Sequence, residues 1–136
     1  MLHRENIMTD RSKSIEVLEQ DVWAEPAFHS SVVCTCHRAR KKPLYQLSGE
    51  EIRCLIGQKT GLKYVIPLAL ERLQSDPLTE VTFYPGDLLA VMLRLDPSDW
   101  EQNPDELQAF RVILKNSHKQ IECCGEIPQK LLTRWL

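Results

Sequence analysis

The sequence contains no apolar run long enough to span a membrane. Its longest apolar stretches, "YVIPLAL" at 64–70 and "LLAVML" at 88–93, fall well short of the roughly 20 residues that a transmembrane helix requires. The first residues, "MLHRENIMTDRSKS", also lack the apolar centre of a secretory signal peptide. We therefore expect a cytoplasmic protein that has no membrane among its partners.

Glycine is scarce, at five residues in 136, and most of the eight prolines lie between apolar segments with helical spacing. Ser48 and Glu51 match a capping box at the start of one such segment. In the next segment Pro67 interrupts the stripe, so we expect the helix to begin near Pro67 or to kink there. The alternating stretch "LTEVTFY" at 78–84 has no strand to pair with and is interpreted as an extended connector.

These patterns predict an all-α fold. We expect a compact single-domain helical bundle of about six helices over residues 14–136, preceded by a flexible leader over residues 1–13. The stretch "FYPGDLL" at 83–89 is interpreted as a Pro-Gly turn followed by a helix start, where an acid such as Asp87 interacts favourably with the helix dipole.

Sequence motifs typical of catalysis are absent. There is no G-x-S-x-G, no H-E-x-x-H, no P-loop and no dinucleotide-binding glycine motif. The four histidines are scattered. Cys36 and His37 are neighbours, but adjacent side chains on a helix point about 100° apart, which is a poor geometry for a nucleophile and its base. We therefore expect that the protein is not an enzyme.

The five cysteines give no clear metal-binding pattern. Cys34 and Cys36 are separated by one residue, and Cys123 and Cys124 are adjacent, whereas structural zinc sites usually use C-x₂₋₄-C pairs. We expect reduced thiols, no metal and no cofactor. An enzyme or metal–thiol redox protein that uses Cys36, Cys123 and Cys124 stays open as an alternative.

Charge is unevenly distributed, although the formal net charge is only -2. Residues 34–63 contain seven basic and two acidic side chains, and residues 71–106 contain nine acidic and two basic ones. One interpretation is a solvated surface, and the other is an acidic surface that meets a basic partner. The basic run "CHRARKK" at 36–42 has no aromatic residues that would stack on bases, so we expect no direct contact with nucleic acid.

The segments "IRCLIGQ" at 52–58, "PLALE" at 67–71 and "FYPGDLL" at 83–89 occur in this order. With Trp23 and Lys42-Pro43-Leu44, they make the chain resemble the immunity proteins of bacterial contact-dependent growth inhibition systems, the CdiI family. The likeness covers roughly residues 22–100. It implies a protein that binds and neutralises the cognate C-terminal toxin domain of a CdiA effector and that does no catalysis of its own.

Many toxins of these systems act on nucleic acid, and the resemblance therefore implies an inhibitor of a basic cleft. From charge and expected exposure we predict a toxin-binding set of acidic contacts and aromatic anchors, namely Asp76, Glu80, Asp87, Asp96, Asp99 and Glu101 with Tyr84 and Trp100. The alternative function is a small helical regulator or adaptor that binds another protein partner. The sequence leaves the oligomeric state open.

Overall fold

The computed structural model describes residues 9–27 and 30–135. In this part of the chain every regular element is helical, apart from an isolated bridge between Ser14 and Pro43. The α-helices are α1 (Ile15–Glu19), α2 (Ser31–Ala39), α3 (Gly49–Gly57), α4 (Leu62–Ser75), α5 (Asp87–Leu93), α6 (Pro104–Asn116), α7 (His118–Glu122) and α8 (Gln129–Thr133), with 3₁₀-helices η2 (Leu44–Gln46) and η3 (Pro97–Trp100). The all-α prediction is confirmed.

Side-chain caps fix the starts of the helices that the sequence marked most clearly. The Ser48 hydroxyl accepts a hydrogen bond of 3.2 Å from the Glu51 N–H, and the Glu51 carboxylate accepts one of 2.9 Å from the Ser48 N–H. This is the predicted capping box, and it starts α3. Ser30 caps α2 in a similar way by accepting from the Val33 N–H.

Helix α4 does not begin at Pro67 but five residues earlier, at Leu62, and it continues through the proline to Ser75. Proline has no N–H to donate to the carbonyl oxygen of Lys63, one turn before it. The side-chain amide of Asn103 donates a hydrogen bond of 3.1 Å to that oxygen instead. A distant residue therefore makes the uninterrupted helix possible.

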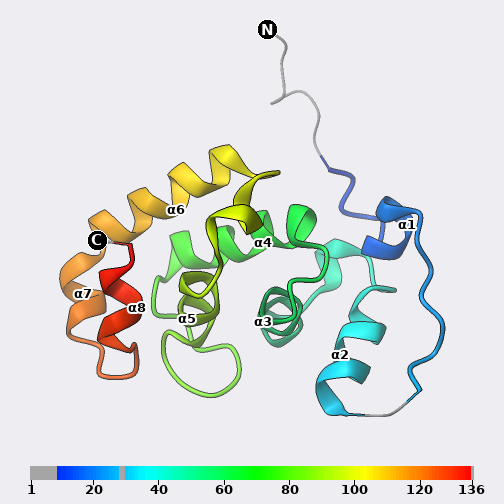
Figure 1. Ribbon diagram of the computed structural model, residues 1–136, viewed down its shortest axis with the longest axis horizontal. Helices are drawn as coiled ribbons and strands as arrows, with labels where there is room; N and C mark the ends of the chain where they lie inside the picture. Colours follow the sequence, from blue (N-terminus) through cyan, green and yellow to red (C-terminus); the bar gives the residue numbers. More distant parts are fainter. Residues whose placement is uncertain (1–8, 28–29, 136) are drawn as a thin grey trace, which may run out of the picture.

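The helices form an elongated arrangement with α5 near its centre (Figure 1). Helices α1 and α2 lie at one end, α6, α7 and α8 lie at the other, and α3, α4 and α5 lie between them. Helix α3 packs on α4, α5 contacts both of these helices, α6 packs on α4, and α8 packs on α5.

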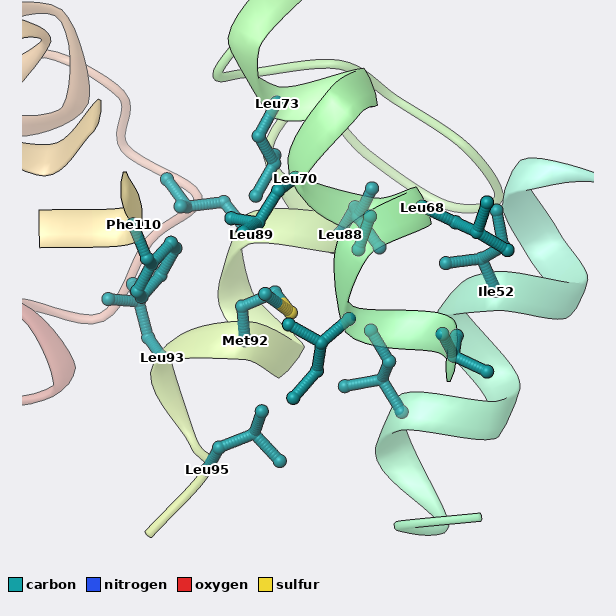
Figure 2. Close-up of a cluster of buried hydrophobic side chains, with 14 of the residues drawn as sticks. Ile52, Leu68, Leu70, Leu73, Leu88, Leu89, Met92, Leu93, Leu95 and Phe110 are labelled. Carbon is teal, nitrogen blue, oxygen red and sulfur yellow. The ribbon is translucent and has the colours of Figure 1, made fainter. Parts of the chain in front are cut away.

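Helix α5 is enclosed almost completely, because six of its seven residues are buried. Figure 2 shows Leu88, Leu89 and Met92 of α5 among leucines of α4, with Ile52 of α3 and Phe110 of α6 nearby. A helix that is apolar on all sides must be covered on all sides. The two ends of α5 are consequently held in fixed positions by the core.

An aromatic cluster joins the C-terminal part of the chain to this core. The ring centroid of Trp100 lies 5.3 Å from that of Phe110 and 6.1 Å from that of Trp135. The Trp135 indole N–H also donates a hydrogen bond of 2.8 Å to the carbonyl oxygen of Leu93, at the end of α5. The C-terminal helices therefore close one side of the central helix.

Residues 1–8 of the predicted leader lie outside the described residues. Within the described part, the Arg11 guanidinium forms an ion pair with Glu71 of α4. The Lys13 carbonyl oxygen accepts a hydrogen bond of 3.1 Å from the Leu44 N–H. Residues 11–13 thus lie against η2 and α4, and the division of the chain after residue 13 stays a prediction.

Candidate functional site

The structure separates the predicted toxin-binding residues into two groups that lie apart and two buried residues. Asp76, Glu80 and Tyr84 belong to the α4–α5 loop, residues 76–86, which is the wide loop at the bottom of Figure 1. Asp96, Asp99 and Glu101, here called the η3 group, lie at or beside η3, after the opposite end of α5. A helix of seven residues spans about 10 Å, so α5 keeps the two groups apart.

Asp87 is 2% exposed, so it is not the surface contact that the sequence predicted. Its carboxylate accepts hydrogen bonds from the backbone N–H groups of Val81 at 3.0 Å, Thr82 at 2.9 Å and Phe83 at 2.7 Å. Burial alone would raise the pKa of Asp87, but these donors outweigh burial and lower it. The charged Asp87 carboxylate therefore lies inside the molecule and stabilises the conformation of residues 81–83 in the α4–α5 loop.

Trp100 is 1% exposed, so it does not serve as an exposed anchor either. Its ring stacks on Phe110 in the core. This burial could not be predicted from local sequence, because the aromatic neighbours of Trp100 come from α6 and from the C-terminal end of the chain. Tyr84 is half-buried in the α4–α5 loop.

Phe83 is the residue of this loop that the sequence analysis missed. Its ring is 70% exposed, and the Arg53 guanidinium lies 4.8 Å from the ring centroid. The Arg53 Nε–H also donates a hydrogen bond of 3.0 Å to the Thr82 hydroxyl. The position of Phe83 close to the Pro85-Gly86 turn was the sequence signal that could have identified it. The alternation of apolar and polar residues at 78–84 predicted only an extended connector.

The α4–α5 loop presents negative charge that no cation of the described residues neutralises. Asp76 accepts a hydrogen bond of 3.2 Å from the Leu78 N–H, which folds the start of the loop. Glu80 is exposed. Within residues 9–27 and 30–135, neither carboxylate takes part in an ion pair.

The η3 group differs because its aspartates are paired. The Lys59 ammonium lies 3.2 Å from the Asp96 carboxylate and 2.9 Å from that of Asp99, and the Arg134 guanidinium lies 3.4 Å from Asp96. The hydrogen bond from Lys59 lowers the pKa of Asp96. Glu101 is exposed and has no ion pair within the described part of the chain.

A polar hollow of about 630 Å³ lies beside the η3 group. Asp99 and Glu101 contribute to its lining, and Lys59 and Lys63 contribute positive charge. Because both signs are present, the hollow has no strong preference for an anion or a cation. It also shows no arrangement of nucleophile and base.

Four of the seven basic side chains in segment 34–63 form ion pairs within the described residues. Arg40 is almost completely buried, lies 3.9 Å from the centroid of the Trp23 ring and pairs with Glu19 at 2.6 Å. Further ion pairs join Lys41 to Glu16, Lys42 to Glu51, and Lys59 to Asp96 and Asp99. The run "CHRARKK" is therefore not a continuous basic surface.

The cysteines do not come together as a reactive group. Cys36 and Cys54 are buried with their Sγ atoms 4.0 Å apart. Burial raises the pKa of the Cys36 thiol to about 12, so it is protonated at neutral pH and is a poor nucleophile. Cys36 lies in α2 and Cys123 follows α7, at opposite ends of the molecule (Figure 1). In the part of the chain that the structure describes, no three His, Cys, Asp or Glu side chains are placed to hold a metal ion.

The fold is a small all-α domain, and its α4–α5 loop carries two exposed carboxylates, Asp76 and Glu80, that form no ion pair within the described residues. None of the helices in the described ranges combines the length and the apolar character needed to cross a bilayer.

A family model described as CDI immunity proteins matches residues 14–110. Because this match covers most of the chain, the protein belongs to the family of CDI immunity proteins, and the resemblance drawn from the sequence is confirmed. It is accordingly a toxin-neutralising immunity protein. No curated protein and no solved structure matches the chain.

Proposed function

We propose that this immunity protein binds the cognate C-terminal toxin domain of a CdiA effector and covers a basic, nuclease-type cleft. It acts in the cytoplasm of the cell that makes it and forms or breaks no covalent bonds. Family membership supports neutralisation by binding. One observation carries the choice of surface: Asp76 and Glu80 expose carboxylates that have no cationic partner within the described residues.

The unpaired charges favour the α4–α5 loop over the η3 group as the main contact. Asp96 and Asp99 already interact with Lys59, so a basic partner must compete with an existing ion pair to engage them. Asp76 and Glu80 meet no such competition, and the approach of a cation therefore adds a new favourable interaction. Glu101, which is exposed and unpaired, joins them in the proposed contact set.

The loop is also organised before any partner arrives. Three backbone N–H groups bind the Asp87 carboxylate, so little conformational freedom is lost when the loop is covered. Opposite charge on the toxin cleft speeds encounter, and the covered cleft is then closed to its nucleic-acid substrate. An inhibitor that covers a basic cleft needs a preorganised surface with exposed negative charge. The α4–α5 loop offers both.

The test compares two double charge reversals in binding kinetics with the toxin domain. Asp76→Lys/Glu80→Lys removes the proposed contacts, and Asp21→Lys/Glu25→Lys makes the same formal change at two exposed positions between α1 and α2. We expect the loop variant to associate at least about tenfold more slowly and to lose much of its salt dependence, because steering acts mainly on the association rate. The control variant should stay close to wild type.

Equal association rates for the loop variant and wild type would overturn the choice of surface. A second readout addresses the function itself, namely survival of cells that express the toxin domain together with the immunity protein. If wild type neither binds the toxin nor protects these cells, neutralisation of this toxin is excluded, and the result favours the adaptor alternative.

A further inference from the structure

Phe83 is a large apolar side chain that is held on the surface by its surroundings. Single exposed apolar residues are common on soluble proteins and need no explanation by themselves. Phe83 differs because the backbone and the ring are both fixed. Its N–H donates to the buried Asp87 carboxylate at 2.7 Å, and its ring lies against the Arg53 guanidinium.

The backbone on which Phe83 sits lies directly against α3. A Cβ atom added to Gly49, at the start of α3, would lie 2.6 Å from Cγ1 of Val81. Arg53, one turn further along α3, donates to the Thr82 hydroxyl. Residues 81–83 are thus attached to α3 through Val81 and Arg53 and to α5 through Asp87. The ring of Phe83 projects from a segment that two helices support.

A fixed, exposed aromatic ring is what a protein interface uses as an anchor. Aromatic residues bring a large contact area with only two rotatable side-chain bonds, so their ordering costs little on binding. The cation of Arg53 lies over the ring and restrains it further. Asp76 and Glu80 of the same loop carry negative charge that neutralises the rim of a basic partner.

We propose that Phe83 is the hydrophobic anchor of the toxin interface and inserts into an apolar pocket rimmed by cationic side chains on the toxin domain. This inference rests on the proposed function and adds to it the residue and the chemistry of the partner surface. The partner is the cognate toxin domain because the exposed, unpaired acids of the same loop favour a basic surface. A second copy of this chain would bring the same acids together and repel.

The experiment measures binding of the purified toxin domain to Phe83→Ala, with Trp23→Ala as the matched control. Trp23 is an exposed aromatic residue, at 41%, and an arginine, Arg40, lies over its ring, but it belongs to the α1–α2 connection instead of the α4–α5 loop. We expect Phe83→Ala to raise Kd by about 30-fold or more, mainly through faster dissociation, as for a buried aromatic hot spot. Trp23→Ala should leave Kd within about threefold of wild type.

Two further variants separate an anchor from a loss of structure. Phe83→Leu keeps an apolar side chain and should retain part of the affinity, whereas Phe83→Lys places a cation against the cationic rim and should bind more weakly than Phe83→Ala. Far-ultraviolet circular dichroism and thermal unfolding verify that each variant is folded. If Phe83→Ala is unfolded, the ranking of Leu above Lys decides the proposal.

The outcomes separate this inference from the proposed function. If wild type binds the toxin and Phe83→Ala binds equally well, the anchor is excluded while neutralisation stands. If Phe83→Ala and Trp23→Ala weaken binding to the same extent, or if Phe83→Lys binds as well as Phe83→Leu, the assignment of Phe83 is likewise overturned. Failure of wild type itself to bind contradicts the proposed function.

Discussion

The side-chain amide of Asn103 donates a hydrogen bond of 3.1 Å to the carbonyl oxygen of Lys63. This oxygen belongs to the turn of α4 in which Pro67 supplies no N–H. Asn103 is buried, and its own backbone N–H donates to the Trp100 carbonyl oxygen at 2.8 Å. The residue before α6 therefore ties η3 to α4 and satisfies a backbone group that the proline leaves unpaired.

Replacement of this amide should destabilise the protein measurably. We expect Asn103→Ala to lower the free energy of unfolding by about 1–2 kcal/mol, because the Lys63 oxygen loses its partner in a partly buried hydrogen bond. Urea unfolding measures the change. In a Pro67→Ala background the helix regains an N–H at position 67, so Asn103→Ala should cost less there. An equal cost in both backgrounds would contradict the link between these residues.

Asp87 should make stability depend on pH in the acidic range. Its folded-state pKa is lowered, so it stabilises the folded state above its unfolded pKa of about 3.9, and this contribution is lost as pH falls through the folded-state value. We expect Asp87→Asn to be less stable at neutral pH and to lose less stability than wild type below about pH 4. Urea unfolding between pH 2.5 and 7 measures this, with Glu80→Gln as the control. If the free energy of unfolding changed with pH equally for Asp87→Asn and wild type, the result would argue against the lowered pKa of Asp87.

The buried Arg40 should depend on its carboxylate partner. Glu19 lies 2.6 Å from the Arg40 guanidinium, and its own side chain is partly exposed. We expect Glu19→Gln to cost about 1–2 kcal/mol, below the full effect of a buried pair because water screens the carboxylate. Glu16→Gln at the Lys41 pair is the control and should cost at most about 0.5 kcal/mol, since Lys41 is exposed. Thermal unfolding compares the two variants. Similar Tm shifts would contradict the expectation that the buried Arg40 depends more on its carboxylate partner than the exposed Lys41 does.

The indole of Trp135 should contribute to stability through its hydrogen bond to Leu93 as well as through packing. We expect Trp135→Phe to cost about 1–2 kcal/mol, because the Leu93 oxygen loses a donor while the aromatic cluster is partly kept. Trp135→Ala should cost about 3 kcal/mol or more, since the packing is lost as well. The exposed Arg134→Ala should stay within about 0.5 kcal/mol of wild type. Chemical denaturation tests this order.

The sequence predicted the helical elements well where local signals determine them. The capping box of Ser48 and Glu51 and the apolar run after Asp87 depend on residues a few positions apart, and both helices are present. The expected count of about six helices is roughly consistent with the eight α-helices of the described residues, and the weakest signals belong to helices such as α7, which has only five residues. Segments this short carry barely one helical repeat, so their periodicity is weak.

The candidate site was predicted less well, since exposure depends on contacts between distant residues. An acid before an apolar run looks the same in sequence whether it faces water or accepts three N–H groups, as Asp87 does. The burial of Trp100 depends on Phe110 and Trp135, and the pairing of Asp96 depends on Lys59, 37 positions away. The charge asymmetry was visible in the sequence, but the side chains that neutralise it were not.

The hydrogen bonds from residues 81–83 to Asp87 use main-chain groups only. Every amino acid except proline offers the same N–H, so substitutions of the exposed Phe83 leave these hydrogen bonds in place. Immunity genes could thus acquire new specificities by changing the outward-facing side chains of a constant backbone frame. The buried Asp87 carboxylate would keep the loop backbone in the same conformation. The exposed side chains of the loop could then change together with the toxin while the fold stays the same.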